Sequence, residues 1–227
     1  ERGETRHVTA RTTGPAAAIA GISPGIQSQG IWMGRRQLFV RFAAEAETAV
    51  LYTPEMLARH VQRVVGQSPL HSISLSGRDP LASEELIVDA MQRWQSPIPV
   101  MVDCDGERPE AVTKVAPYVA MVQVTVEFVN TSSSLDRALA SLTAASAAGR
   151  DHAAVLTPHE GTTDGQMLWF IEQAHRVAPG TKIVVHPVVG AERTGVDRRY
   201  ASLLERGMAI HNDLAFWLRI PGPVGGR

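Results

Sequence analysis

The sequence predicts an α/β protein built on a parallel β-sheet, and three observations support this class. Short apolar segments typical of strands alternate with longer amphipathic segments, and this alternation continues from residue 38 to residue 220. Strands separated by helices indicate βαβ units and a parallel sheet. The strand segments are also apolar along their length, which we expect of strands covered on both faces. Hydrophobic residues make up 44% and charged residues 20% of the chain, as in ordinary globular domains.

The elements can be assigned in order along the chain. The first predicted strand covers residues 38–44, and the helix after it covers 53–65, where apolar residues recur at helical spacing. A strand over 71–75 comes next, and Ser83 is expected to cap the following helix, whose first turn is acidic. The remaining predicted strands cover 99–103, 119–128, 152–157, 182–187 and 214–220. The helices between them cover 108–116, 133–149, 162–178 and 196–209.

Periodicity leaves two architectures open for these units, a partial barrel and an open, doubly wound sheet. Both place the working site beyond the carboxyl ends of the strands. That rule selects candidate residues at the strand ends. They are Arg41, Ser76, Gly77, Arg78, Asp79, the segment 103–107, Glu127, the segment 157–160, and His186.

Composition excludes several classes of function. The 22 basic and 23 acidic residues almost cancel, so the net charge favours neither a nucleic-acid partner nor a membrane surface. No apolar run reaches the ~20 residues of a membrane span. The single cysteine, Cys104, cannot form an intramolecular disulfide, and a cytoplasmic location is the simplest interpretation. We expect residues 1–25 to form a polar, flexible N-terminal extension, and 26–227 to form one domain.

Residues 26–42 (IQSQGIWMGRRQLFVRF) resemble the first-strand segment of the 7-carboxy-7-deazaguanine synthases, members of the radical S-adenosylmethionine (SAM) superfamily. In that family a Gln-Gly-Glu-Gly turn precedes a strand that carries a phenylalanine and an arginine. Gln27 and Gly30 match the turn, Gln29 stands at its glutamate, and Arg41 matches the arginine. The resemblance implies a radical-SAM-type partial TIM barrel with a (β/α)6-like parallel sheet.

The family's cluster motif, CxxxCxxC followed by Asp-Thr-Pro, comes directly after this strand. The corresponding residues 43–55 (AAEAETAVLYTPE) retain Thr53 and Pro54 but contain no cysteine. Because a [4Fe–4S] cluster needs thiolate ligands, we predict that no iron–sulfur cluster is bound. In the family this threonine contacts a magnesium ion, and the alternative for Thr53 is a helix cap ahead of Pro54.

Residues 74–82 (SLSGRDPLA) resemble the Gly-Gly-Glu-Pro turn that holds the amino group of SAM, and residues 102–110 resemble the next strand end. The resemblance implies a SAM site at Ser76, Gly77, Asp79 and Asp103. The alternative is a tight turn in which Asp79 acts as a cap. Arg78 replaces a glycine of the motif, and its guanidinium would suit a phosphate or carboxylate better than a sulfonium.

The resemblance assigns substrate binding to Gln27, Gln29 and Arg41. Arg41 lies on a strand expected to be buried, where an unpaired charge is costly. It therefore needs a ligand or an ion pair, for which Glu45 and Glu127 are the candidates.

Three further candidates follow later strands, namely His159, Glu160 and His186. A histidine and a carboxylate at strand ends suit acid–base chemistry or metal binding. We predict catalytic roles for them and no metal.

Two classes of function remain open. The chain is either an enzyme that binds SAM or another small, carboxylated ligand without radical chemistry, or a pseudoenzyme that serves as partner or scaffold for an active biosynthetic enzyme. The resemblance also implies a homodimer. A pocket plugged by Trp32, Tyr52 and Arg78 would exclude the enzyme.

Overall fold

The computed structural model describes residues 14–128, 132–187 and 196–217. The strands are β1 (Ala17–Ile26), β2 (Arg36–Phe42), β3 (Val50–Tyr52), β4 (Ser72–Gly77), β5 (Val100–Cys104), β6 (Met121–Glu127), β7 (Asp151–Thr157), β8 (Lys182–Val185) and β9 (Leu214–Phe216). The helices are α1 (Pro54–Gln67), α2 (Glu84–Arg93), α3 (Pro109–Val115), α4 (Ser132–Ala147), α5 (Asp164–Val177) and α6 (Val196–Met208). Short 3-10 turns cover Pro80–Ser83 and Ala116–Tyr118.

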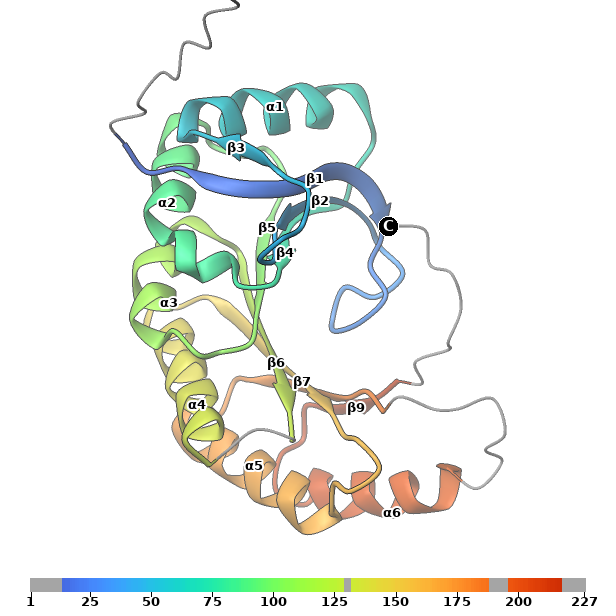
Figure 1. Cartoon of the computed structure of the whole chain (residues 1–227). Helices are drawn as coiled ribbons and strands as arrows, with labels where there is room; N and C mark the ends of the chain where they lie inside the picture. The colour runs from blue at the N-terminus through green and yellow to red at the C-terminus, as the bar shows by residue number, and fades with distance from the viewer. Residues whose placement is uncertain (1–13, 129–131, 188–195, 218–227) are drawn as a thin grey trace, which may run out of the picture.

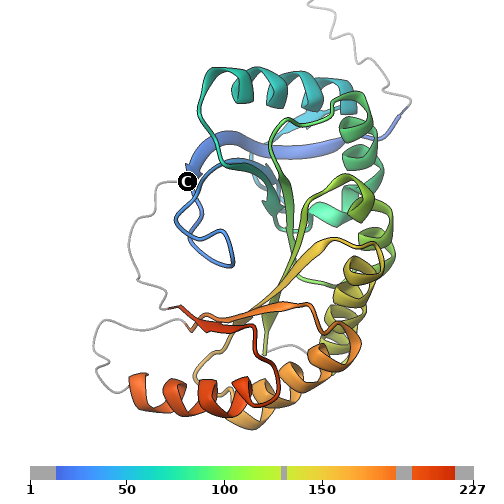
Figure 2. The same ribbon diagram turned by 180° about the vertical axis from the view of Figure 1, so that it is seen from behind.

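The strands form one curved sheet in the order β3-β1-β2-β4-β5-β6-β7-β8-β9. From β2 through β4 to β9 every neighbouring pair is parallel. The sheet bends into a horseshoe with the helices on its outer side (Figures 1 and 2). Within the described residues β3 and β9 are its two edges, so the barrel is open. The predicted α/β partial barrel is confirmed.

The predicted N-terminal extension over residues 1–25 is wrong for its second half. β1 occupies Ala17–Ile26 and pairs antiparallel with both β2 and β3. Ala17 and Ile19 are buried in the main core. Gly21 and Pro24 interrupt the apolar pattern. Because glycine and proline are unfavourable inside strands, the sequence did not predict a strand here. Residues 1–13 lie outside the described part of the chain.

The two faces of the parallel strands differ in composition. On β4, Ile73 and Leu75 are buried in the core formed with the helices, while Ser72 and Ser74 alternate with them. Because successive side chains of a strand point to opposite faces, these serines face the concave side. Gln123 on β6 lies on that side too and is fully buried. The expectation of strands that are apolar on both faces is therefore wrong at these positions of the concave face.

The segment 27–35 fills part of the concave side. It closes on itself through hydrogen bonds between the backbones of Gln27 and Arg35 (2.9 Å) and of Gly34 and Gln27 (2.8 Å). Both ribbon views show it curling into the centre of the horseshoe (Figures 1 and 2). Ile31 and Trp32 pack there against a small cluster of strand residues. That cluster consists of Met101, Met121 and Ala153.

None of the helices in the described ranges is long and apolar enough to cross a membrane.

Candidate functional site

A cavity of about 400 Å³ opens at the carboxyl ends of β4, β5 and β6. Four of the residues that the resemblance assigned to the SAM or substrate site line it, namely Gln29, Ser76, Gly77 and Asp103. Gln29 reaches it from the segment 27–35, and the other three end neighbouring strands. The remaining lining is mostly charged or polar. It comprises Arg78, Cys104, Asp105, Glu107, Thr125 and Glu127.

Asp103 is a partly buried carboxylic acid of this cavity. Burial raises the pKa of Asp103, and hydrogen bonds with the side chains of Gln123, Thr125 and Gln29 act in the opposite direction. The Thr125 hydroxyl donates to Asp103 Oδ1 at 3.2 Å. A carboxyl group whose charged form is disfavoured in a cavity can hold or transfer a proton, and such groups are often functional.

The turn after β4 depends on a glycine. Gly77 has a φ of +117°, and a Cβ there would lie 2.2 Å from the carbonyl oxygen of Phe42. A side chain is excluded because the ends of β2 and β4 approach so closely. The next residue, Arg78, donates its backbone N–H to that same oxygen at 3.3 Å. The glycine therefore fixes where the cavity wall turns.

Asp79 is engaged within the turn. Its Oδ1 accepts from the backbone N–H of Ala82 at 3.1 Å, which is a cap of the 3-10 turn. Its Oδ2 lies 2.9 Å from the guanidinium of Arg108. Asp79 is absent from the described lining of the cavity. The capping alternative is the one the structure shows.

Arg41 is half-exposed rather than buried, which corrects the expectation from sequence. It forms an ion pair with Glu47 at 2.6 Å, and neither Glu45 nor Glu127 is the partner. The other carboxylate oxygen of Glu47 accepts from the backbone N–H of Ala44 at 3.0 Å. The segment after β2 thus folds onto Arg41, outside the described lining of the cavity.

The three residues predicted to be catalytic are not brought to this cavity. His159 and Glu160 are exposed on the segment between β7 and α5. The His159 Nδ1 accepts from the backbone N–H of Gly161 at 3.1 Å, a local turn contact. His186 follows β8 and is fully buried, with its backbone N–H donating to Leu156. Within the described residues, no group of three or more histidine, cysteine, aspartate or glutamate side chains could hold a metal ion.

The plug that would exclude an enzyme is not seen among the described residues. The Tyr52 hydroxyl lies 2.8 Å from Nδ1 of His60, away from the cavity. Trp32 packs inside the barrel with its ring centroid 5.2 Å from that of His71. Arg78 lines the cavity wall without closing it.

Sequence reasoning missed Gln123 and Thr125. Both lie on β6 and, with Glu127, recur at every second position of an otherwise apolar strand. That period of two places them on one face and could have identified them.

A second cavity, of about 620 Å³, lies beside the first. Its lining comes from the start of β1, the end of β2 with the segment after it, and the turn after β4. The lining residues are Ala18, Phe42, Ala43, Ala44, Glu45, Arg78, Asp79, Ala82 and Ser83. Arg78 belongs to both cavities.

Comparisons with known proteins agree with this geometry. No protein-family model matches the chain. A 7-carboxy-7-deazaguanine synthase from Methanothermobacter thermautotrophicus is 26% identical over 114 residues, which cover 44% of this chain and 45% of that protein. The chain thus matches less than half the length of this curated relative. The crystal structure of QueE from Escherichia coli superposes with a TM-score of 0.59, over 89% of this chain and 93% of that one, at 11% identity.

The chain has a QueE-like fold. A phospho-2-dehydro-3-deoxyheptonate aldolase from Thermotoga maritima overlays less closely, with a TM-score of 0.42 at 14% identity, over 80% of this chain and 50% of that one. In the QueE-like fold of this chain, the cavity lies where parallel α/β barrels carry their sites, at the carboxyl ends of the strands.

Proposed function

We propose that this QueE-like chain works without an iron–sulfur cluster, and that it binds SAM or another small, carboxylated ligand for non-radical chemistry. The observation that carries the proposal is the open, polar cavity of about 400 Å³ beside Asp103. Small-ligand sites are concave and carry a few convergent polar groups. This cavity has such groups from three neighbouring strands and from the segment 27–35.

The residues present do not fit a cluster. Residues 43–55, which correspond to the cluster segment in the resemblance, contain no cysteine. Cys104 is buried in the main core, and burial raises the pKa of its thiol. A thiol that resists ionisation is a poor metal ligand, and one thiolate cannot replace three. This argument supports a non-radical function.

The residues that line the cavity do fit a charged small molecule. The carboxylate of Glu127 would attract an ammonium or sulfonium group, and Arg78 would attract a carboxylate. SAM carries all three groups. Asp103 could hold a hydrogen bond or a proton at the ligand, because burial already favours its protonated form.

Calorimetric titration of the full chain with SAM tests the proposal. The variant Asp103→Asn keeps the size of the side chain and removes its charge. We expect it to weaken binding by roughly tenfold or more, as for loss of a buried hydrogen bond to a charged group. The matched control is Asp136→Asn on α4, an exposed residue outside the described lining of the cavity. Absence of heat with SAM and with small carboxylates, or equal affinity of the Asp103→Asn variant, would overturn the proposal.

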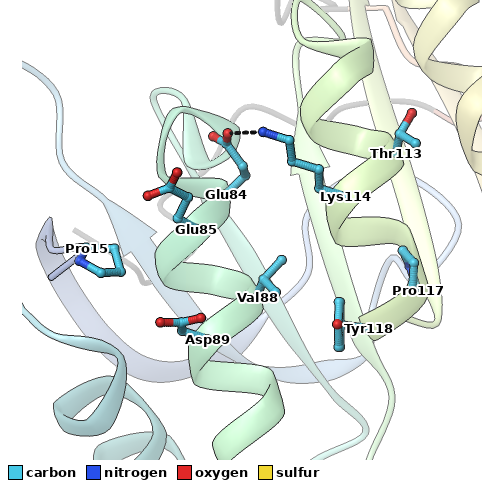
Figure 3. Close-up of a pocket in the computed structure, with 9 residues that line it drawn as sticks. All are labelled: Pro15, Glu84, Glu85, Val88, Asp89, Thr113, Lys114, Pro117 and Tyr118. Atoms are coloured by element: carbon cyan, nitrogen blue, oxygen red, sulfur yellow. Dashed lines mark hydrogen bonds and ion pairs between the residues drawn. The ribbon is translucent and has the colours of Figure 1, made fainter.

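A different observation supports a second candidate function, that of a scaffold without catalysis. A groove of about 510 Å³ runs between α2 and α3 on the outer side of the barrel. Figure 3 shows Glu84 and Lys114 forming an ion pair across it, at 3.0 Å. Glu85 and Asp89, one helical turn apart on α2, also line the groove. Among the described residues neither has an ion-pair partner, so the groove carries excess negative charge.

The occupant that fits this groove is a basic, extended segment of a partner protein. The exposed ring of Tyr118 lines the groove and could stack against an arginine. Binding of a labelled arginine-rich peptide, followed by fluorescence anisotropy, tests this candidate. The double variant Glu85→Gln with Asp89→Asn should weaken binding and its salt dependence, whereas Glu55→Gln on α1 should leave both unchanged. Equal binding to all three proteins would exclude the groove.

A further inference from the structure

Arg78 is a cation without a carboxylate partner at the proposed binding cavity. It is exposed and lines both cavities at the carboxyl ends of the strands. Among the residues that the structure describes, no aspartate or glutamate lies within ion-pair distance of its guanidinium. A guanidinium presents five N–H donors in a planar fork that matches carboxylate and phosphate oxygens.

Two acidic groups that line these cavities are engaged by other arginines, whereas Glu45, Asp105 and Glu127 line them without an ion pair among the described residues. Asp79, the next residue, is held by Arg108 at 2.9 Å. Glu107, which lines the same cavity as Arg78, lies 3.7 Å from Arg137. Within the turn itself, Arg78 has no ion-pair partner among the described residues, and the charge of Asp79 is neutralised by Arg108. A turn that grips an ammonium group would need the opposite arrangement.

The backbone that carries Arg78 is fixed on both sides. Gly77 adopts a conformation that the close approach of Phe42 requires, and Arg78 donates its own N–H to that residue. On the other side Asp79 caps the 3-10 turn. The guanidinium thus extends from a rigid base, which lowers the entropy lost when it binds a ligand.

The second cavity leaves space for an anionic group beside Arg78. Its walls carry the small side chains of Ala43, Ala44 and Ala82 together with two carboxylates, Glu45 and Asp79, of which Asp79 is paired with Arg108. Ser83, the N-cap residue of α2, also lines it and makes no side-chain cap hydrogen bond. The hydroxyl of Ser83 and the N-terminus of α2 are therefore further donors for oxygen atoms of an anion.

We propose that Arg78 is the specificity-determining residue of this site, and that it anchors a carboxylate or phosphate group of the ligand between the two cavities. The rest of the ligand then extends toward Asp103 and Glu127, which suit an amine or hydroxyl group. The inference rests on the proposed function, since it concerns the same cavity. It places any sulfonium group away from Arg78, because like charges repel.

Calorimetry with four ligands and four proteins tests this assignment. The ligands are SAM, which has a carboxylate, methylthioadenosine, which has the nucleoside and sulfur without that carboxylate, adenosine monophosphate, and inorganic phosphate. The proteins are the wild type, Arg78→Ala, Arg78→Lys and the control Arg93→Ala on α2. Arg93 is exposed and absent from the described lining of both cavities.

We expect Arg78→Ala to weaken binding of the anionic ligand by about tenfold or more, because a charge-assisted contact is lost. Methylthioadenosine should bind this variant and the wild type equally, and Arg78→Lys should recover part of the affinity. Stronger binding of SAM than of the two phosphates identifies a carboxylate, and the reverse order identifies a phosphate. Both results support the assignment.

Two outcomes would overturn the assignment. One is equal or tighter binding of every anionic ligand by Arg78→Ala. The other is a loss of affinity in Arg78→Ala that methylthioadenosine shows to the same extent. If Asp103→Asn still weakens binding in either case, the proposed function stands and the role of Arg78 fails. If none of the ligands, nor any small carboxylate, binds the wild type, the proposed function itself fails. Thermal unfolding of each variant verifies that it is folded.

Discussion

The helix-facing and concave faces of the sheet are built from alternate residues of the same strands, yet they obey different physical rules. On β4, Leu75 is buried against the helices, and its neighbour Ser74 is buried on the concave side. Burying a leucine side chain contributes about 1.5–3 kcal/mol. Burying a hydroxyl group without a partner costs about 1–3 kcal/mol. Within the described residues, Ser74 Oγ has no hydrogen-bond partner.

This difference separates stability from function in the molecule. The helix-facing side supplies apolar burial along every parallel strand, and the concave side carries the polar residues of the cavity. Asp103 shows the consequence, since burial disfavours its charged form while the cavity keeps it beside a binding space. Natural proteins often retain such locally unfavourable residues where they function.

The largest loss of stability is expected at Gly77, where a substitution disturbs both faces of the sheet at once. Gly77→Ala places a Cβ 2.2 Å from the backbone oxygen of Phe42 at a φ of +117°, so β2 and β4 must separate. We expect a loss of about 4 kcal/mol or more in the free energy of unfolding, measured by urea denaturation. Gly66→Ala is the control, because nothing lies within 4 Å of its Cβ and alanine favours a helix. Similar stabilities for the two variants would show that the turn can relax.

The second prediction compares adjacent residues of β4 directly. Leu75→Ala should lower the free energy of unfolding by about 2–5 kcal/mol, since it leaves a void in the core. Ser74→Ala removes a buried hydroxyl without a described partner, and it should be neutral or stabilising, within about 1 kcal/mol. Urea denaturation of both variants measures the difference. A large loss in Ser74→Ala would mean that the concave face contributes to stability as much as the other face does.

The third prediction concerns the pH dependence of the concave face. Because burial raises the pKa of Asp103 above its usual value of about 3.9, ionisation of this group destabilises the fold. The stability that the protonated group contributes is fully present below the unfolded pKa and is lost as the pH rises through the folded pKa. Asp103→Asn should therefore be more stable than the wild type at neutral pH. Thermal unfolding from pH 7 down to about 4 should show this advantage disappearing.

The smallest effect on stability is expected for the Glu84–Lys114 pair on the outer side of the barrel, and its pH dependence is opposite to that of Asp103. The hydrogen bond from Lys114 lowers the pKa of Glu84, so this pair contributes stability above the unfolded pKa of Glu84. That contribution is lost as the pH falls through the folded pKa. Lys114→Met should reduce stability slightly at neutral pH, and the difference should vanish in acid. Thermal unfolding over the same pH range measures it, and a difference that grows toward acid would contradict the assigned cause.

Much of the fold was predictable from local patterns. All seven predicted strands and all six predicted helices are found within a few residues of their expected positions. Thr53 was one of two interpretations, and it caps α1 by accepting from the backbone N–H of Met56 at 3.3 Å. Capping and periodicity act over a few residues, so the sequence displays them directly. The sequence did not predict β1, because this strand is stabilised by pairing with β2 and β3 rather than by a pattern of its own residues.

The site was predictable in part. Gln29, Ser76, Gly77 and Asp103 were selected from strand ends and from the resemblance, and they line one cavity. Asp79 was selected in the same way, but its partner Arg108 lies 29 residues further along the chain. No local pattern shows that such a pair forms.

By itself the sequence determined the order of the parallel strands and of the helices between them, and the absence of cysteine from residues 43–55, because these follow from residue type and short spacing. Tertiary structure alone decided which charges are neutralised. It paired Arg41 with Glu47 and Asp79 with Arg108, and it left Arg78 at the cavity without a described partner. The physical reason is that an ion pair requires its atoms to lie within a few ångströms of each other. That distance is set by how strands and turns distant in sequence pack against one another.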